Sequence, residues 1–168
     1  GRTLEAREME AWIYARSTQP LTRKAIVELI EACRCATRLR FVPTKTAGAS
    51  LEPAWSRLLV EDEEGKSPIV FEHVTDDEAV RKAVEELVFI LDMSRATKAR
   101  GRVREHIART VRLFRITFDD DAMAADLRAA LPTIAAFIAK STDAIVRYPQ
   151  RGRSDVFLDA RWKPIYRL

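Results

Sequence analysis

Two β-rich runs flank an acidic turn in residues 57–74, RLLVEDEEGKSPIVFEHV. Valine, isoleucine and phenylalanine favour extended backbone, and a polar connection containing Gly65 is typical of the turn between paired strands. The stretch therefore predicts an antiparallel β-hairpin. Because an isolated hairpin is only marginally stable in water, it must pack on helices or gain a third strand from elsewhere in the chain.

A helix start follows the hairpin directly. Thr75 can accept a hydrogen bond from a free amide of the first turn, and Glu78, three residues later, can return the bond. Asp76 and Asp77 lie where the helix dipole favours negative charge. We therefore predict a helix here, with an apolar stripe formed by Val80, Val84, Leu87, Val88 and Leu91.

The same periodicity recurs through much of the remaining chain. It predicts helices over residues 4–16, after Thr3 as cap, 22–39 and 102–116, and two more between residues 119 and 149, the second opened by Pro132. The predicted fold class is therefore α+β and mainly α, a compact helical domain of about five to seven helices around one core that carries the small antiparallel β-hairpin.

The length of 168 residues suits a single domain, and 47% apolar with 32% charged residues is typical of a globular protein. We expect one domain over residues 1–168. It divides into a helical hairpin (1–50), a β-hairpin insert (51–74), a helical core (75–148) and an extended tail (149–168). The tail mixes aromatic and charged side chains and is a candidate third strand for the hairpin.

The cysteines favour a reducing compartment. Cys33 and Cys35 lie two apart in a predicted helix, where their side chains point roughly 200° apart and cannot bond to each other. The expected location is therefore the cytoplasm. No apolar run reaches the roughly 18 residues that a membrane-spanning helix needs, so we expect no membrane span.

Positive charge is concentrated between residues 95 and 115. This stretch holds eight basic residues and one acid, whereas the whole chain has a net charge of only +4. Segregated charge indicates a partner of opposite sign. The tail adds a basic and an aromatic residue of the kinds enriched in interfaces. The predicted partner-binding residues are Arg95, Lys98, Arg100, Arg102, Arg104, Arg109, Arg112, Arg115, Arg161 and Trp162.

Three interpretations of this basic surface remain open. The first is an acidic protein partner, a neighbouring domain or a second copy in a homodimer. The second is nucleic acid bound without sequence specificity through its phosphates. Aromatic residues that would stack on bases are lacking, because Phe114 alone lies within the stretch and its register is inward. In the third, the arginines simply pair with the protein's own acids.

Catalytic and metal-binding patterns are weak. His73 and His106 have no evident orienting partner or nucleophile. Three adjacent acids, residues 119–121, suit helix capping better than Mg²⁺ binding. The two cysteines and two histidines lack zinc-ligand spacing. We therefore predict a non-catalytic binding or regulatory module without a cofactor. The alternative is an enzyme with a noncontiguous site around the acids and His73.

Overall fold

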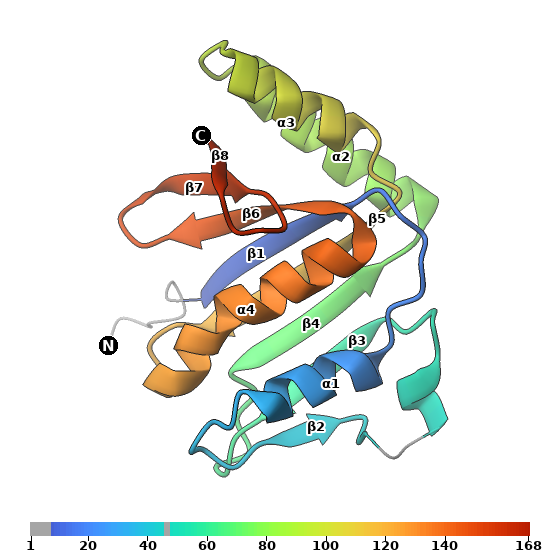
Figure 1. Ribbon diagram of the computed structural model, residues 1–168, viewed down its shortest axis with the longest axis vertical. Helices are drawn as coiled ribbons and strands as arrows, with labels where there is room; N and C mark the ends of the chain where they lie inside the picture. The colour runs from blue at the N-terminus through green and yellow to red at the C-terminus, as the bar shows by residue number, and fades with distance from the viewer. Residues whose placement is uncertain (1–7, 46–47) are drawn as a thin grey trace, which may run out of the picture.

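A computed structural model describes residues 8–45 and 48–168 and shows one eight-stranded antiparallel sheet (Figure 1). The strand order is β2-β3-β4-β5-β1-β6-β7-β8. The strands are β1 (Glu8–Ala15), β2 (Arg40–Val42), β3 (Arg57–Glu61), β4 (Ile69–Val74), β5 (Arg112–Asp119), β6 (Ala144–Gln150), β7 (Arg153–Leu158) and β8 (Pro164–Arg167). The helices are α1 (Arg23–Ala32), α2 (Asp77–Asp92), α3 (Lys98–Ala108) and α4 (Ala125–Thr142), with a short 3-10 helix, η2 (Gly48–Leu51).

The predicted fold class was wrong in its balance. The fold is α+β and rich in sheet, with four α-helices in the described part of the chain instead of five to seven. Residues 8–15, predicted as helix, form β1 near the centre of the sheet. Residues 112–116, predicted to end a helix, belong to β5, its neighbour. Describing the chain as helical was wrong for the same reason.

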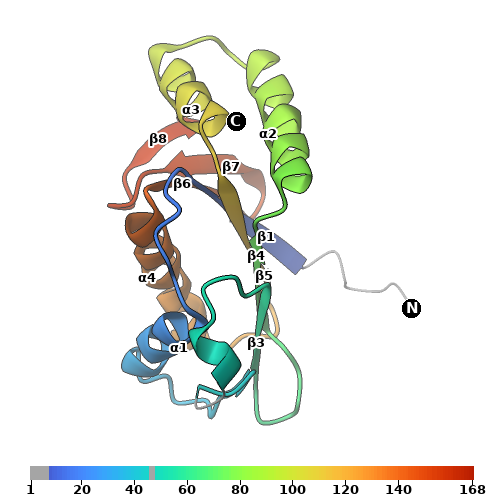
Figure 2. The same ribbon diagram turned by 90° about the vertical axis from the view of Figure 1, so that its right-hand side faces the viewer.

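Two layers of helices cover the sheet unequally. Figures 1 and 2 show α1 and α4 along one face, with α2 and α3 over one end of the other. Side chains alternate between the faces, so Ile13 joins the core under α1 and α4, whereas Tyr14 joins the core under α2 and α3. Within the described residues, the rest of the second face has no helix over it.

The hairpin prediction is confirmed, with β3 paired antiparallel to β4 and Gly65 in the turn at a positive φ of 79°. The helix prediction after it is also confirmed, although Asp76 and not Thr75 is the cap, accepting from the amide of Ala79. The proposed third strand was misplaced. The tail forms β7 and β8 beside β6, whereas β2 and β5 flank the hairpin.

Two helix ends differ from the prediction. Helix α1 ends at Ala32, so Cys33 and Cys35 lie beyond it, as free thiols. The two helices expected between residues 119 and 149 are the single helix α4, which contains Pro132 in its interior. Asp143 ends α4 in the left-handed conformation, and the chain turns directly into β6.

Candidate functional site

Two arginines of the basic stretch, Arg112 and Arg115, belong to β5 and bind groups of the protein itself. Arg112 is buried, donates to the carbonyl of Gln19 and lies over the ring of Phe114. Arg115 lies on the uncovered sheet face and donates to Glu72 Oε1 at 2.6 Å. Their positive charge therefore serves the protein's own structure.

Three more arginines of the stretch have partners around α3. Arg100 donates to the carbonyl oxygens of Leu91 and Ser94. Arg104 pairs with Asp92 at 2.7 Å, and this hydrogen bond lowers the pKa of the Asp92 carboxyl. Arg109 pairs with Glu105, four residues away on the same face. Pairing with the protein's own acids thus accounts for part of the basic stretch.

The remaining cations of the stretch are Arg95, Lys98 and Arg102. All three are exposed, and their side chains have no ion pair or hydrogen bond within residues 8–45 and 48–168. The two predicted partner-binding residues of the tail, Arg161 and Trp162, have different surroundings. Arg161 is exposed in the β7–β8 turn, whereas Trp162 packs edge-on against Tyr148 at 5.0 Å.

Three large apolar side chains are exposed near the end of α2, the helix that precedes these cations in the chain. Met93 is 77% exposed, Phe89 67% and Ile90 39%, although all three are large apolar side chains. None of the three is among the partner-binding residues predicted from the sequence. The available signal was their position outside the stripe of residues 80, 84, 87 and 91, which faces the sheet. We call the six residues Phe89, Ile90, Met93, Arg95, Lys98 and Arg102 the α2–α3 tip.

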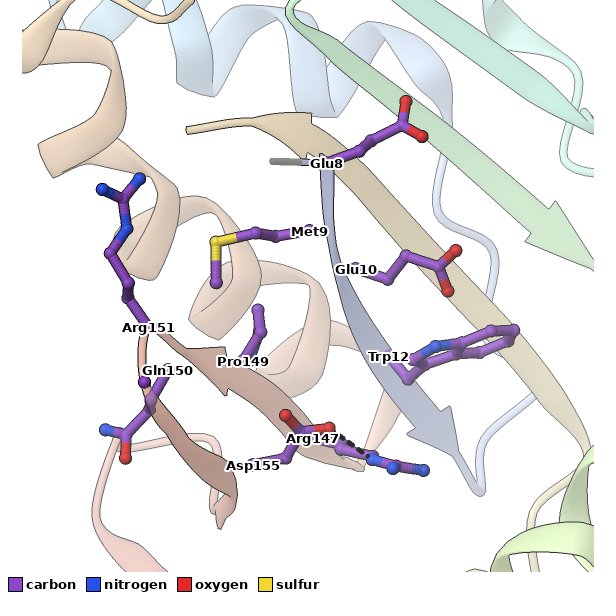
Figure 3. A pocket seen from close by; sticks show the side chains of 10 residues that line it. Glu8, Met9, Glu10, Trp12, Arg147, Pro149, Gln150, Arg151 and Asp155 are labelled. Carbon is purple, nitrogen blue, oxygen red and sulfur yellow. Dashed lines mark hydrogen bonds and ion pairs between the residues drawn. The ribbon is translucent and has the colours of Figure 1, made fainter. Parts of the chain in front are cut away.

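A cavity of about 650 Å³ lies beside β1, and its lining residues are different from those of the α2–α3 tip. Its size falls in the usual range for ligand sites. Figure 3 shows side chains from β1 and from the β6–β7 hairpin around it. The lining residues are Glu8, Met9, Glu10, Trp12, Arg147, Pro149, Gln150, Arg151, Gly152 and Asp155.

The cavity carries an excess of negative charge. Arg147 is neutralised by Asp155 at 2.8 Å, and Arg151 pairs with Asp120 and Asp121 outside the lining. Glu8 has no ion pair within the described residues, and Glu10 reaches only a distant one, 3.7 Å from Arg115. A positively charged group is therefore the complementary ligand.

Both histidines are buried, away from this cavity. His73 Nδ1 lies 2.9 Å from the carbonyl of Trp55, and the ring stacks on Phe114. His106 Nε2 lies 2.9 Å from the carbonyl of Tyr14. Neither ring faces an acid and a nucleophile together, so the geometry gives no support to a site built around His73.

The acids at residues 119–121 have local partners. Asp119 accepts from the amides of Asp121 and Ala122, while Asp120 and Asp121 bind Arg151. In the part of the chain that the structure describes, no group of three or more histidine, cysteine or acidic residues is placed to hold a metal ion. The same residues include no helix long and apolar enough to cross a bilayer.

Comparison of the chain with protein-family models, curated proteins and solved structures gave no significant match. Any functional conclusion therefore depends on the two surfaces described above.

Proposed function

We propose that this chain is a non-catalytic protein-binding module that docks an acidic protein partner through the α2–α3 tip. The observation that carries the proposal is the exposure, close to the turn between α2 and α3, of three apolar side chains and of three cations that have no partner in the described structure. The turn between the helices stands at one extremity of the molecule (Figure 1), where a partner could approach it without obstruction.

The apolar part of the tip supports a protein partner over nucleic acid. Phenylalanine and methionine are enriched in protein interfaces, and they supply the buried anchors around which polar contacts form a rim. A phosphate backbone needs cations but gains little from Phe89 and Met93. Phe89 is the single aromatic residue of the tip, whereas single-stranded nucleic acid is bound by several aromatic residues on which successive bases stack, so this ligand is disfavoured as well.

The charge of the tip favours an acidic partner. Lys98 and Arg102 are one turn apart on α3, and Arg95 lies in the turn before it. Long-range attraction to an acidic surface would raise the association rate, and salt would reduce this effect. The contact of the apolar anchors would depend less on salt.

The proposal can be tested by affinity capture from source cells followed by reconstitution. The immobilised wild-type chain is compared with Phe89→Ser/Met93→Ser and with Arg95→Glu/Lys98→Glu/Arg102→Glu. We expect both variants to lose the same acidic protein. The purified form of that protein should bind the wild-type chain in calorimetry and should lose at least about tenfold in affinity for each variant.

The matched control reverses three exposed cations elsewhere, Arg38→Glu/Lys140→Glu/Lys163→Glu, with the same change in net charge. It should retain the partner. Duplex and single-stranded DNA are titrated in parallel across a salt series. Equal capture by the wild-type chain and both tip variants would refute the proposal, and tight, salt-steep DNA binding that the tip variants lose would assign the surface to nucleic acid.

A further inference from the structure

The sheet is split beside β1. On one side β1 pairs with β5 along its whole length, from Glu8 to Ala15. On the other side it pairs with β6 only from Trp12 to Ala15. Residues 8–11 therefore have no strand partner on the β6 side within the described structure, although they lie in the interior of the sheet order.

The split results from the path of β6. The register of its pairing with β7 shifts between Tyr148 and Gln150. Pro149, which lies at this point, has no amide hydrogen to donate to a neighbouring strand. Strand β6 nevertheless continues its pairing with β7. The ion pairs of Arg151 with Asp120 and Asp121 hold the β6–β7 turn against the loop before α4. The split is therefore built into the fold.

Backbone groups of β1 face the split. Ala15 accepts from Val111 on the β5 side, and Arg16 donates to Asp143 on the β6 side. Backbone groups alternate along a strand, so the even-numbered residues of β1 face β6. The amides and carbonyl oxygens of Glu8 and Glu10 are thus directed into the cavity of about 650 Å³.

The two outer edges of the sheet are protected against pairing, whereas this inner edge is not. Strand β2 has three residues, and β8 begins with Pro164 and carries Arg167, which are features that discourage addition of a strand. Beside the split, by contrast, β1 has neither proline nor lysine. Its exposed side chains there are the carboxylates of Glu8 and Glu10, which repel acidic segments and attract basic ones.

We propose that the split binds an extended basic segment of a partner protein as an added strand along residues 8–11 of β1. Main-chain hydrogen bonds to Glu8 and Glu10 supply the pairing, and lysine or arginine side chains of the segment meet the two carboxylates. Four residues of edge span about 13 Å, so the segment recognised is short. This site is separate from the α2–α3 tip and opposite to it in charge, so either proposal can fail alone.

The cavity wall already shows how a guanidinium is held here. Trp12 carries the guanidinium of Arg115 over its ring, 5.4 Å from the centroid. In Figure 3, Glu10 and Trp12 extend to the same side of β1, and Arg147 reaches toward that side from β6. Arg115 already occupies the Trp12 ring and lies 3.7 Å from Glu10, so Glu8, which has no ion pair within the described residues, is the carboxylate most open to an incoming cation.

The test uses the full chain and two capped hexapeptides. In one peptide lysine alternates with valine or threonine, and in its twin glutamate replaces lysine. Amide NMR of the labelled chain reads binding directly at residues 8–11. We expect the basic peptide to shift these amides and to slow hydrogen exchange at Glu8 and Glu10 by about tenfold or more. The acidic twin should do neither.

Two variants separate the contributions of charge and backbone. Glu8→Gln/Glu10→Gln should weaken the basic peptide by about tenfold, whereas the matched control Glu28→Gln/Glu63→Gln should not. Glu10→Pro removes an amide that faces the split and should abolish the peptide's effect. Because proline could disturb β1, its thermal unfolding is measured in parallel, and the double glutamine variant keeps the test decisive if the proline variant does not fold.

Three outcomes would overturn the proposal. The first is equal binding of both peptides. The second is a peptide response confined to residues outside 8–11. The third is protection of the Glu8 and Glu10 amides without peptide at rising protein concentration, which would identify a second copy of the chain as the occupant. The variant Phe89→Ser/Met93→Ser should bind the basic peptide normally, so that failure of the tip proposal is distinguishable.

Discussion

Arg115 and Trp12 face each other directly across the β1–β5 pair, and the guanidinium lies over the indole ring. The same guanidinium donates through Nε and Nη2 to Glu72 on β4. A single side chain thus connects three adjacent strands on the face that α2 and α3 leave uncovered. The charge that sequence analysis assigned to a partner is part of the sheet's own cross-strand structure.

Replacement of Arg115 by alanine should lower the free energy of unfolding by about 1 kcal/mol, since the pair with Glu72 is partly exposed. A double-mutant cycle with Trp12→Ala should give a coupling of about 0.5–1 kcal/mol for the cation–π contact. Urea denaturation of the four proteins measures both quantities. A coupling near zero would mean that the ring and the guanidinium are only neighbours.

Acid should destabilise the fold through His73. Burial first, and then the charge of Arg112, lowers the pKa of His73 to about 4, and Nε2 has no hydrogen-bond partner among the described residues. Between pH 6.5 and 4 the unfolded chain therefore binds more protons than the folded chain, so stability falls as the pH falls through this window. The loss should approach about 3 kcal/mol at pH 4.

The measurement for His73 is urea unfolding between pH 7.5 and 4. His73→Gln should flatten the dependence on pH, even if it lowers stability at neutral pH. Burial also lowers the pKa of His106, so a residual slope in the same direction is expected from that residue. An unchanged slope in the His73 variant would assign the acid sensitivity to other groups.

Two glycines should respond oppositely to alanine. Gly65 has a positive φ of 79° and no atom near the added Cβ, so Gly65→Ala should cost about 1 kcal/mol through backbone strain alone. Gly101 lies inside α3 with equally open space, and Gly101→Ala should add about 0.5–1 kcal/mol of stability. Thermal unfolding of both variants checks the difference in sign.

The apolar side chains of the tip should matter little for folding. Phe89→Ser/Met93→Ser should change the free energy of unfolding by no more than about 0.5 kcal/mol, because both residues are already largely exposed. Leu87→Ala, two residues before Phe89 but buried against the core, should cost about 2–5 kcal/mol. A large loss of stability in the serine variant would show that the patch is structural, which denaturant titration can detect.

Local signals predicted the elements whose boundaries depend on nearby residues. The β3–β4 hairpin and α2 follow from a turn glycine, a polar helix start and clear periodicity, although the cap is Asp76 and not the predicted Thr75. Strand β1 was missed because its two faces pack in different cores, Ile13 under α1 and α4 and Tyr14 under α2 and α3. With apolar residues on both faces, the alternation that marks a strand is lost, and the segment resembles a helix.

Strand β5 was missed for a related reason. Val103, Ile107, Val111 and Phe114 are spaced as on one helix, yet the chain leaves α3 at Ala108 and enters the sheet at Arg112. The run Leu113-Phe-Arg-Ile-Thr-Phe118 was the available strand signal. For the candidate site, charge in the sequence located the free cations of the tip. The cavity beside β1 depends on where β1 stops pairing with β6, a strand more than 100 residues later in the chain, and could not be predicted.

The position of β1 constrains the order in which the protein can assemble. Among the described residues β1 pairs only with residues 112–119 and 144–147, so both of its partner strands are synthesised long after it. During synthesis β2, β3 and β4 can form a local meander before β5 and β6, the strands that pair with β1, have been made. Such non-local pairing slows folding, and a nascent chain that stops before residue 144 exposes β1 to chaperones or to aggregation.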